Sequence, residues 1–263
     1  MATTFCISDL YQFHHEVIGK GSYSVVRKAI KRHSAELVAI KCIEKKQLNT
    51  AEELAIPHRE IQALKSLPRH PNAVYLMDSF EDASHVFLVF ELARKGTLAD
   101  WLSMQPLGLA ECDAKSVVKQ LASAIDHVHS HGLVHVDITP RNVLIDDGGV
   151  VKLSDFGFAV RKTSILLGMR GSMNYASPEL IRGDEFNEST DVWSLGVLAY
   201  ETLTGFAPFS GSDNCSTLTS VPFPDSIWSG KPAQAKDFIA YLLTLESHHR
   251  PCIRQVRNHL WLN

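Results

Sequence analysis

Hydrophobic and polar residues alternate with a period of two over the first part of the chain. From Phe13 to Lys46 the alternation forms three short runs, which a glycine-containing turn and a polar turn separate. This period is typical of half-buried strands, and short turns between such runs favour antiparallel pairing. We therefore predict a three-stranded meander, then a strand that begins near Val74 and an apolar strand over residues 85–92.

Elsewhere apolar residues recur at three- and four-residue steps, which predicts helices. The segments with this pattern are 57–67, 111–131, 189–200, 235–245 and a short last one between Arg250 and Trp261. The segment 189–200 begins with capping residues and is otherwise almost wholly apolar, so we expect a helix buried on all sides with Asp191 hydrogen-bonded. Residues 210–231 are rich in Ser, Pro and Gly and predict a loop.

Composition indicates an ordinary soluble globular protein, long enough for two lobes with a sizeable core. The chain has 263 residues, of which 45% are hydrophobic and 21% are charged. Its net charge of −3 gives no reason to expect nucleic acid or an acidic membrane surface as a partner. No apolar run reaches transmembrane length and no signal sequence is evident. The five cysteines are scattered and odd in number, which favours free thiols in a reduced compartment.

Three histidines lie at the end of the helix predicted over 111–131, and Gly132 should end that helix. His127 and His131 are four residues apart and would share one face, which is a metal-ligand spacing. No acidic or cysteine partner lies nearby at a useful spacing. We therefore favour a solvated helix end for these two and for His129, where protonated histidine would suit the negative end of the helix dipole.

Three side chains with oxygen atoms stand close together in the middle of the sequence. Asp137 and Asn142 are five residues apart, and Asp155 precedes a Phe-Gly pair. Residues 143–153 predict a hairpin with a glycine-containing turn, which would bring Asp155 back beside Asp137. Phosphoryl transfer needs a group that accepts a hydroxyl proton and oxygens that hold Mg²⁺ against phosphates. Each of these residues alone would be an ordinary loop residue.

A glycine-rich turn and a lysine upstream are candidates for phosphate contacts. Gly19 and Gly21 lie between two predicted strands, and Lys41 lies in the third. A Gly-x-Gly alone is weak evidence and fits a plain hairpin turn, but its strand-to-strand position argues against a dinucleotide site. A lysine that is fixed beside phosphates also needs a carboxylate to hold it. Glu60 on the predicted helix offers one, although without Lys41 it would be a solvated helix charge.

These motifs, in this order, resemble those of the eukaryotic-type protein kinases. The resemblance extends from about Tyr11 to Trp261. It implies an α+β, bilobal fold with a small lobe over 11–91, a hinge over 92–95 and a mainly helical large lobe over 96–261. The small lobe would hold five antiparallel strands and one helix. We expect a bare catalytic domain of the Ser/Thr type, loosely similar to the calmodulin-dependent group.

The resemblance also implies roles for individual residues. Asp137 would be the catalytic base, and Lys41, held by Glu60, would contact the phosphates of ATP. Asn142 and Asp155 would hold Mg²⁺. The residues implied around the nucleotide are Ile18, Gly19, Lys20, Gly21, Ser22, Tyr23, Ser24, Val25, Val26, Ala39, Lys41, Glu91, Ala93 and Leu144.

Three positions of the catalytic loop depart from the family pattern. Val136 stands where the family commonly has an Arg that grips a phosphate on the activation loop, so we expect an enzyme that needs no such phosphate. Thr139 replaces the Lys that contacts the transferred phosphate, which weakens the electrostatic stabilisation and would lower the rate. Arg141 stands where kinases that prefer basic substrates carry Glu, which disfavours an Arg upstream of the phosphorylated residue.

Residues 158–176 are irregular and polar, and we predict a mobile activation segment there. Thr163, Ser164 and Ser172 are candidate phosphorylation sites. We also expect Ser172 to bond Asp137 in place of the missing Lys.

Two further expectations come from the resemblance. His135 would pack under Phe156, and Asp191 would hold the backbone of the catalytic loop. Ser177-Pro178-Glu179 resembles the substrate-side anchor of the family, with Ser177 where Ala is usual. Arg250 matches the Arg that pairs with this Glu, and such a buried pair would be costly to half-remove.

Three functions are open at this point. The first is an active kinase that transfers the γ-phosphate of ATP to Ser or Thr hydroxyls of proteins. The second is a pseudokinase scaffold, with Val136 and Thr139 as signs of decay. The third is a small-molecule phosphotransferase, which can share the Asp-to-Asn loop. We expect ATP and a protein substrate as partners, no nucleic acid, no membrane, a monomeric state, and a cytoplasmic location with the nucleus as the alternative.

Overall fold

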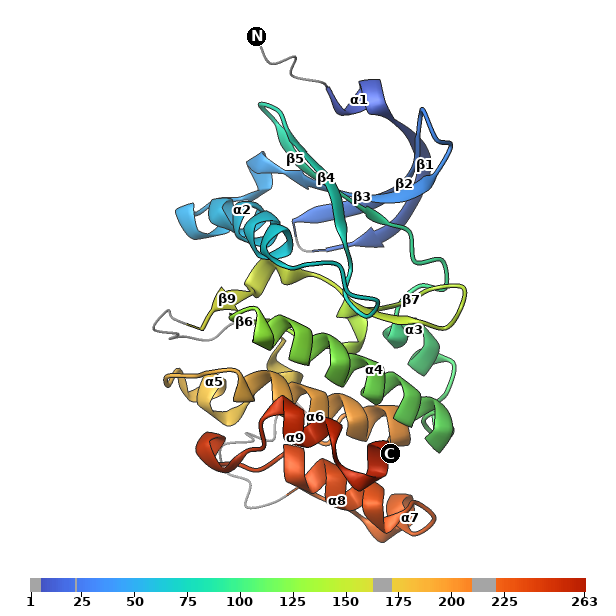
Figure 1. The fold of residues 1–263 in the computed structure, drawn as a ribbon, viewed down its shortest axis with the longest axis vertical. Helices are drawn as coiled ribbons and strands as arrows, with labels where there is room; N and C mark the ends of the chain where they lie inside the picture. The colour runs from blue at the N-terminus through green and yellow to red at the C-terminus, as the bar shows by residue number, and fades with distance from the viewer. Residues whose placement is uncertain (1–5, 22, 163–171, 210–220) are drawn as a thin grey trace.

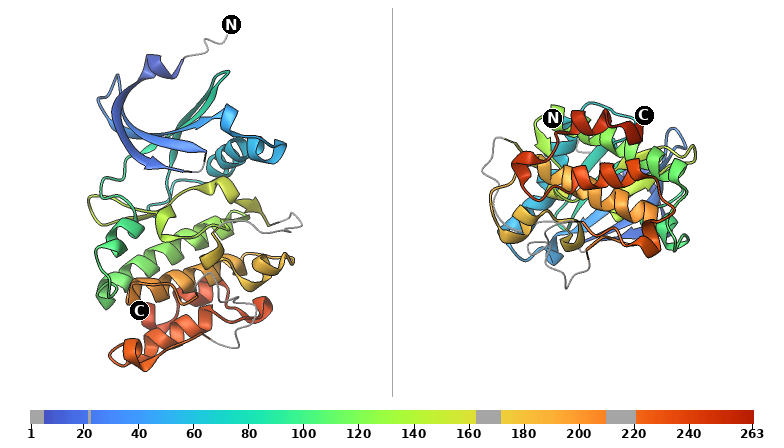
Figure 2. Two further views of the ribbon diagram at one scale, coloured as in Figure 1. Left: turned by 180° about the vertical axis from the view of Figure 1, so that it is seen from behind. Right: turned by 90° about the horizontal axis from the view of Figure 1, so that it is seen from below.

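The computed structural model describes residues 6–21, 23–162, 172–209 and 221–263. They form a β-sheet with helix α2 (Ala51–Ser66) and, below it in Figure 1, a larger group of helices. The expected α+β, bilobal architecture is therefore confirmed, with the sheet in the small lobe and most helices in the large lobe. Figure 2 shows from behind that short connecting segments lie where the two lobes meet.

The small lobe is built on one antiparallel sheet with the strand order β1-β2-β3-β5-β4. Its strands are β1 (Tyr11–Lys20), β2 (Ser24–Lys31), β3 (Leu37–Glu44), β4 (Leu76–Glu81) and β5 (His85–Glu91), and the short helix α1 (Ile7–Leu10) precedes them. The predicted meander and the two later strands are thus confirmed. Lys41 lies on the central strand, where it pairs with Val26 on one side and Leu88 on the other.

Helix α2 begins at Ala51, so the predicted start at Pro57 was wrong. The start is fixed by a capping box, in which the Thr50 hydroxyl accepts from the Glu53 N–H at 3.1 Å and the Glu53 carboxylate accepts from the Thr50 N–H at 3.2 Å. Pro57 lies inside the helix, where its missing N–H forfeits one backbone bond. The helix nevertheless continues from the cap to Ser66.

The large lobe is a stack of helices around α4, which crosses the lobe below the junction in Figure 1. Its helices are α3 (Leu98–Ser103), α4 (Glu111–Ser130), α5 (Pro178–Arg182), α6 (Ser189–Thr204), α7 (Asp225–Trp228), α8 (Ala233–Leu242) and α9 (Ile253–Arg257). Helix α6 is buried almost throughout, as its apolar sequence predicts. Gly196 allows α8 to come close, because a Cβ there would stand 2.9 Å from Leu242 Cβ.

Some predicted bounds in the large lobe were wrong. Helix α8 ends at Leu242 rather than at 245, and α7 lies inside the loop predicted over 210–231. Residues 210–220 of that loop lie outside the described part of the chain. The last predicted helix is divided into α9 and a 3-10 turn, η7 (Leu260–Leu262).

Two small sheets at the junction of the lobes position the candidate catalytic residues. Strand β6 (Leu133–Val134) pairs with β9 (Val160–Arg161), and β7 (Val143–Ile145) pairs with β8 (Val151–Leu153). The predicted hairpin over 143–153 is therefore confirmed. The Asp137 loop runs from β6 to β7 and Asp155 follows β8, so the two carboxylates are held on neighbouring loops.

Candidate active site

Lys41 forms ion pairs with two carboxylates, Glu60 on α2 of the small lobe and Asp155 at the junction of the lobes. Its Nζ lies 2.8 Å from Glu60 Oε2 and 2.9 Å from Asp155 Oδ1. Burial alone would lower the pKa of Lys41, but the two carboxylates outweigh it and raise that pKa above its usual value. Burial would likewise raise the pKa of Asp155, and the nearby ammonium lowers it instead. The lysine and Asp155 are therefore both charged at neutral pH.

Glu60 also fixes α2 against the segment that follows Asp155. Its carboxylate, 1% exposed, accepts a hydrogen bond from the Phe156 N–H. Gly157 lies so close to this helix that a Cβ there would meet Ile56 Cγ2 at 3.2 Å. Phe156 is fully buried and meets the His135 ring edge-on at 4.7 Å between ring centroids, as expected for these two residues. Helix, lysine and Asp155 thus form one connected unit.

Asp191 holds the backbone of the catalytic loop, as the resemblance implies. Its carboxylate accepts from the His135 N–H and the Val136 N–H, each at 2.8 Å. It also lies 2.8 Å from His129 Nε2. Burial would raise the pKa of Asp191, but His129 and the loop amides lower it below its ordinary value. This buried carboxylate, on α6, therefore positions the residues just before Asp137.

The solvated helix end expected for His129 was wrong, because His129 is 6% exposed and bound to Asp191. The other two histidines lie nearer the surface, and the His127 ring stacks on His70 with 4.6 Å between centroids. Sequence gave no reason to pair His129 with a residue 62 positions away. Among the residues that the structure describes, no group of three or more His, Cys, Asp or Glu could hold a metal ion.

Both carboxylate oxygens of Asp137 accept hydrogen bonds. Oδ2 accepts from Asn142 Nδ2 at 2.7 Å, and Oδ1 accepts from the backbone N–H of Ser172 at 2.8 Å. The side chain is 8% exposed, so these two donors fix its orientation in a largely dry site. We expected Ser172 to bond Asp137, and it does so through its amide. The amide of Ser172 therefore supplies a hydrogen-bond donor beside the candidate base. Unlike the absent Lys, this donor carries no positive charge.

Asn142 and Asp155 offer oxygen atoms that suit Mg²⁺. Asn142 uses its Nδ2 to bond Asp137, which leaves its Oδ1 without a protein partner among the described residues. Asp155 keeps one oxygen beyond its Lys41 contact, and its side chain is 43% exposed. Mg²⁺ prefers such oxygens and keeps several waters, so one or two protein ligands together with substrate phosphates are sufficient. The residues present therefore fit this ion.

The glycine-rich turn joins β1 to β2, and β2 pairs in turn with the strand that carries Lys41. Gly19 pairs with Val26 across the two strands, and the Gly21 N–H donates to the Ser24 carbonyl at 2.8 Å. Ser22 lies outside the described residues. Tyr23, which we expected at the nucleotide, donates its hydroxyl to Glu53 on α2 at 2.7 Å. Its ring is therefore tethered to the helix that carries Glu60.

A set of small and apolar residues lies where the adenine would sit. Ala39 is buried opposite Phe90 on β5, and Leu144 on β7 is partly buried below. Among the described residues Glu91 pairs with Lys152 at 3.0 Å, so its carboxylate is turned toward the large lobe. Ala93 makes no hydrogen bond within the described chain. Half-buried backbone groups need a partner, and a bound adenine would supply one.

Val136 fills an apolar cluster beside the catalytic loop. It is 3% exposed and packs with Val134, Ala176, Leu180 and Phe186. Val136 also adopts φ of +74°, a left-handed conformation that is rare for a β-branched residue. The chain therefore accepts backbone strain to bury this side chain. Sequence reasoning identified the absent Arg but had no signal for the cluster that replaces it.

The substrate-side anchor is held by a buried ion pair. Arg250 donates to Glu179 at 2.8 and 3.2 Å through its two terminal nitrogens, as the resemblance implies. The guanidinium also lies over the Trp193 ring, 5.1 Å from its centroid. Ser177, which stands where Ala is usual, bonds the Thr190 hydroxyl at 2.7 Å. The segment after residue 171 is thus fixed to α6 and to Arg250, which precedes α9.

Tyr175 and Arg141 line the surface beside the Asp137 loop. Tyr175 donates its hydroxyl to Glu201 on α6. Burial and this carboxylate raise the pKa of Tyr175, and burial raises the pKa of Glu201. Arg141 is exposed and has no ion-pair partner among the described residues. Thr163 and Ser164, two candidate phosphorylation sites, lie outside those residues.

The junction of the lobes holds the parts of a phosphotransferase. They are a lysine between two carboxylates, an aspartate in a fixed orientation, and oxygen atoms available to a metal ion. The family described as protein kinase domain matches residues 12–262, which is nearly the whole chain. The chain therefore belongs to the protein kinase family. No helix among the described residues is long and apolar enough to cross a membrane.

Curated relatives define the kind of kinase. The chain is 35% identical over 266 residues to calcium/calmodulin-dependent protein kinase type 1B of Rattus norvegicus, covering 98% of this chain and 76% of the relative. It is 32% identical over 251 residues to NUAK family SNF1-like kinase 1 of Homo sapiens, covering 94% of this chain. It spans 38% of that second relative. The domain is of the serine/threonine kinase type, and its similarity to the calmodulin-dependent group is confirmed.

Proposed function

We propose that this chain transfers the γ-phosphoryl group of ATP to serine or threonine hydroxyls of proteins, with Mg²⁺ bound through Asn142 and Asp155. The observation that supports this most is the junction of the lobes. Lys41 Nζ lies 2.9 Å from Asp155, and Asp137 is held on the neighbouring loop by Asn142. Phosphoryl transfer depends on positioning and electrostatics, and these residues supply both.

The proposed reaction is an in-line displacement. The substrate hydroxyl oxygen forms a bond to the γ-phosphorus while the bond from that phosphorus to the bridging oxygen of ADP breaks. The hydroxyl proton passes to the carboxylate of Asp137. Lys41 binds the non-transferred phosphates, and the Gly19–Gly21 turn covers them, since glycines without Cβ let the backbone come close. When bound, Mg²⁺ neutralises charge that develops on the phosphates.

We further propose that this kinase needs no phosphate on its activation segment. In the resemblance, the residue at position 136 is an Arg that orders this segment through a phosphate. Here Val136 is buried among apolar residues that include Ala176, with Phe158 and Val160 packed against them. Apolar burial can hold the described ends of the segment, residues 158–162 and 172–176, in place without a charge. A phosphatase-treated protein should therefore keep its activity.

The surface beside Asp137 supports a preference against basic substrates. A basic residue upstream of the phosphorylated residue would need an available carboxylate near Arg141. Glu201 is the carboxylate near Tyr175, and it is already bound by that hydroxyl. Arg141 itself would repel an arginine and attract an acidic side chain. We also propose a monomeric state, and a cytoplasmic or nuclear location, which fits the free cysteines among the described residues.

A pseudokinase scaffold is the second candidate, because Thr139 is buried and supplies no cation to the transferred phosphate. Incubation with Mg-ATP and a generic protein substrate separates the two. Phosphoserine or phosphothreonine in that substrate, absent with Asp137→Asn, supports the kinase. Nucleotide binding with no transfer at any enzyme concentration supports the scaffold. Phosphorylation of a sugar or amine, with none of protein, would favour a small-molecule phosphotransferase.

A further inference from the structure

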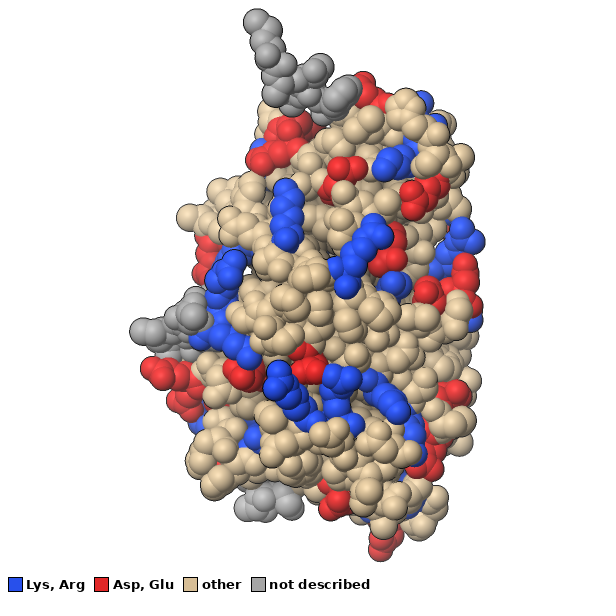
Figure 3. Space-filling view, viewed as in Figure 1, with Lys and Arg blue, Asp and Glu red and all other residues tan. Residues whose placement is uncertain are grey.

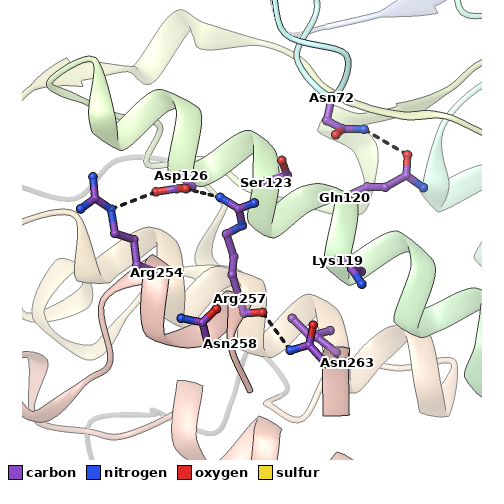
Figure 4. A pocket seen from close by; sticks show the side chains of 10 residues that line it. Asn72, Lys119, Gln120, Ser123, Asp126, Arg254, Arg257, Asn258 and Asn263 are labelled. Carbon is purple, nitrogen blue, oxygen red and sulfur yellow. Dashed lines mark hydrogen bonds and ion pairs between the residues drawn. The ribbon is translucent and has the colours of Figure 1, made fainter. Parts of the chain in front are cut away.

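A hollow of about 690 Å³ opens on the large lobe between α4 and α9, away from the candidate active site. Figure 4 shows that its walls come from these two helices and from the loop that carries Asn72, with Asn263 among the labelled lining residues. The residues that matter are Lys119, Gln120, Ser123, Asp126, Arg254 and Arg257. We call it the α4–α9 hollow. It shares no residue with the candidate active site.

The base of the hollow is held by a hydrogen-bond network between the lobes. Asn72 donates to Gln120 at 3.0 Å and to the Val151 carbonyl at 2.9 Å. The Val151 N–H donates to the same Gln120 oxygen at 2.9 Å. Three segments far apart in sequence are therefore fixed together. The hollow is formed before any partner arrives, so binding does not require ordering of these elements.

The charges around the hollow are mostly positive. Lys119 is exposed and has no ion-pair partner among the described residues. Arg254 is 80% exposed and lies 3.9 Å from Asp126, whereas Arg257 contacts the same carboxylate more closely. Three cations and one carboxylate thus line the hollow, and only Arg254 and Arg257 pair with that carboxylate, in a chain whose net charge is −3. Figure 3 shows a row of Lys and Arg side chains across this face.

The lining also limits the kind of partner. Of the described residues that line the hollow, Leu262 alone is apolar, and it is 1% exposed. Binding would therefore depend on charge and hydrogen bonds rather than on apolar burial. No aromatic ring lines the described wall, so bases of a nucleic acid would find no stacking platform.

From this geometry we infer that the α4–α9 hollow docks an acidic segment of a protein partner. Aspartate and glutamate side chains of that segment would pair with Lys119 and Arg254, and its backbone N–H groups would donate to Asp126 or Ser123. This docking goes beyond the proposed phosphoryl transfer and is independent of it. Contacts of this kind are weak, screened by salt and well suited to a transient partner.

The test is fluorescence anisotropy with a short labelled peptide of Asp, Glu and Gly, at an ionic strength on the order of 50 mM. The wild-type protein should bind it, and added salt should weaken the binding. Lys119→Glu combined with Arg254→Glu should weaken it roughly tenfold, because two attractive contacts become repulsive. Arg257 stays unchanged in this variant so that Asp126 remains paired.

The matched control is Lys65→Glu, which reverses an exposed charge on α2, outside the hollow. It should bind the peptide like the wild type. Equal affinity of the double variant and the wild type would overturn the inference, as would no binding of the peptide at low salt. An oligonucleotide that binds the hollow while the peptide does not would assign it to nucleic acid instead. Unchanged phosphorylation of an uncharged generic substrate shows that the double variant is folded, whichever way the docking result falls.

Discussion

The left-handed backbone at Val136 leads to an unusual order of stability among substitutions. Val136 has φ of +74° and is 3% exposed. Both Val136→Ala and Val136→Gly remove the two γ-methyl groups from the apolar cluster, which costs about 1.6 kcal/mol at about 0.8 kcal/mol per buried group. Alanine keeps the left-handed penalty of about 1–2 kcal/mol, and glycine is free of it.

The glycine variant in turn loses about 0.5–1 kcal/mol of folding stability relative to alanine, because its unfolded chain has more conformational freedom. The difference leaves Val136→Gly equal to Val136→Ala in stability or up to about 1.5 kcal/mol more stable. Gln62 on α2 is an exposed helical position and serves as the control. There glycine should be about 1 kcal/mol less stable than alanine, as in any helix interior.

Unfolding in urea, followed by tryptophan fluorescence, gives the four free energies of unfolding. The account expects the glycine-minus-alanine difference to be zero or positive at 136 and negative at 62. If alanine is the more stable variant at both positions by a similar amount, the backbone at Val136 is not left-handed and the strain argument is refuted. If neither substitution at 136 lowers stability relative to wild type, the side chain does not contribute to the apolar cluster.

Three other expectations concern the buried ion pair, the buried aspartate and the activation segment. Arg250→Met should lower the free energy of unfolding by about 3–5 kcal/mol, since it leaves Glu179 buried and unpaired. Adding Glu179→Met should restore part of this loss. Strictly additive losses of the two substitutions in urea unfolding would contradict the ion pair. Asp191 has a pKa below its ordinary value, so its ionised form stabilises the fold above about pH 4 and that contribution is lost as the pH falls through the folded pKa. Urea unfolding of Asp191→Asn should therefore show lower stability at neutral pH and a flatter acid limb than wild type, and parallel curves would refute this. Phosphatase treatment of the purified protein should leave the rate of substrate phosphorylation unchanged, and abolished activity would show that an activation-segment phosphate is required after all.

Much of the site could be predicted because its residues lie close in sequence or follow family spacing. Asp137, Asn142 and the hairpin before Asp155 fall within one short stretch. The Lys41–Glu60 pair followed from a strand and a helix that are neighbours in the chain. Residues of this kind need only local structure to be brought together, and sequence patterns describe local structure well.

The features that sequence missed all depend on distant contacts or on backbone angles. His129 is buried because α6 packs beside α4 and places Asp191 against it. A bond from Ser172 to Asp137 was expected, but not that the backbone amide of Ser172, 35 residues away, would be its donor. The left-handed conformation of Val136 has no counterpart in residue preference, since β-branched residues rarely adopt it. Neither periodicity nor composition contains this information.

The start of α2 is a different kind of error. Both capping residues were visible in the sequence, at Thr50 and Glu53, three positions apart. The prediction used the spacing of Ile61, Leu64 and Leu67 and did not use this capping box, so it placed the start at Pro57, which lies inside the helix. The cap determined the start, and the proline was accommodated.

The central claim is that Asp137, Lys41 and Asp155 act together on one bound nucleotide and one hydroxyl. Single-turnover phosphate transfer to a protein substrate at saturating Mg-ATP tests it most directly, with nucleotide affinity measured in parallel. Asp137→Asn should lower the transfer rate by about 10²–10⁴-fold, the usual contribution of a general base, with little change in ATP affinity. Transfer by Asp137→Asn at the wild-type rate would contradict the account.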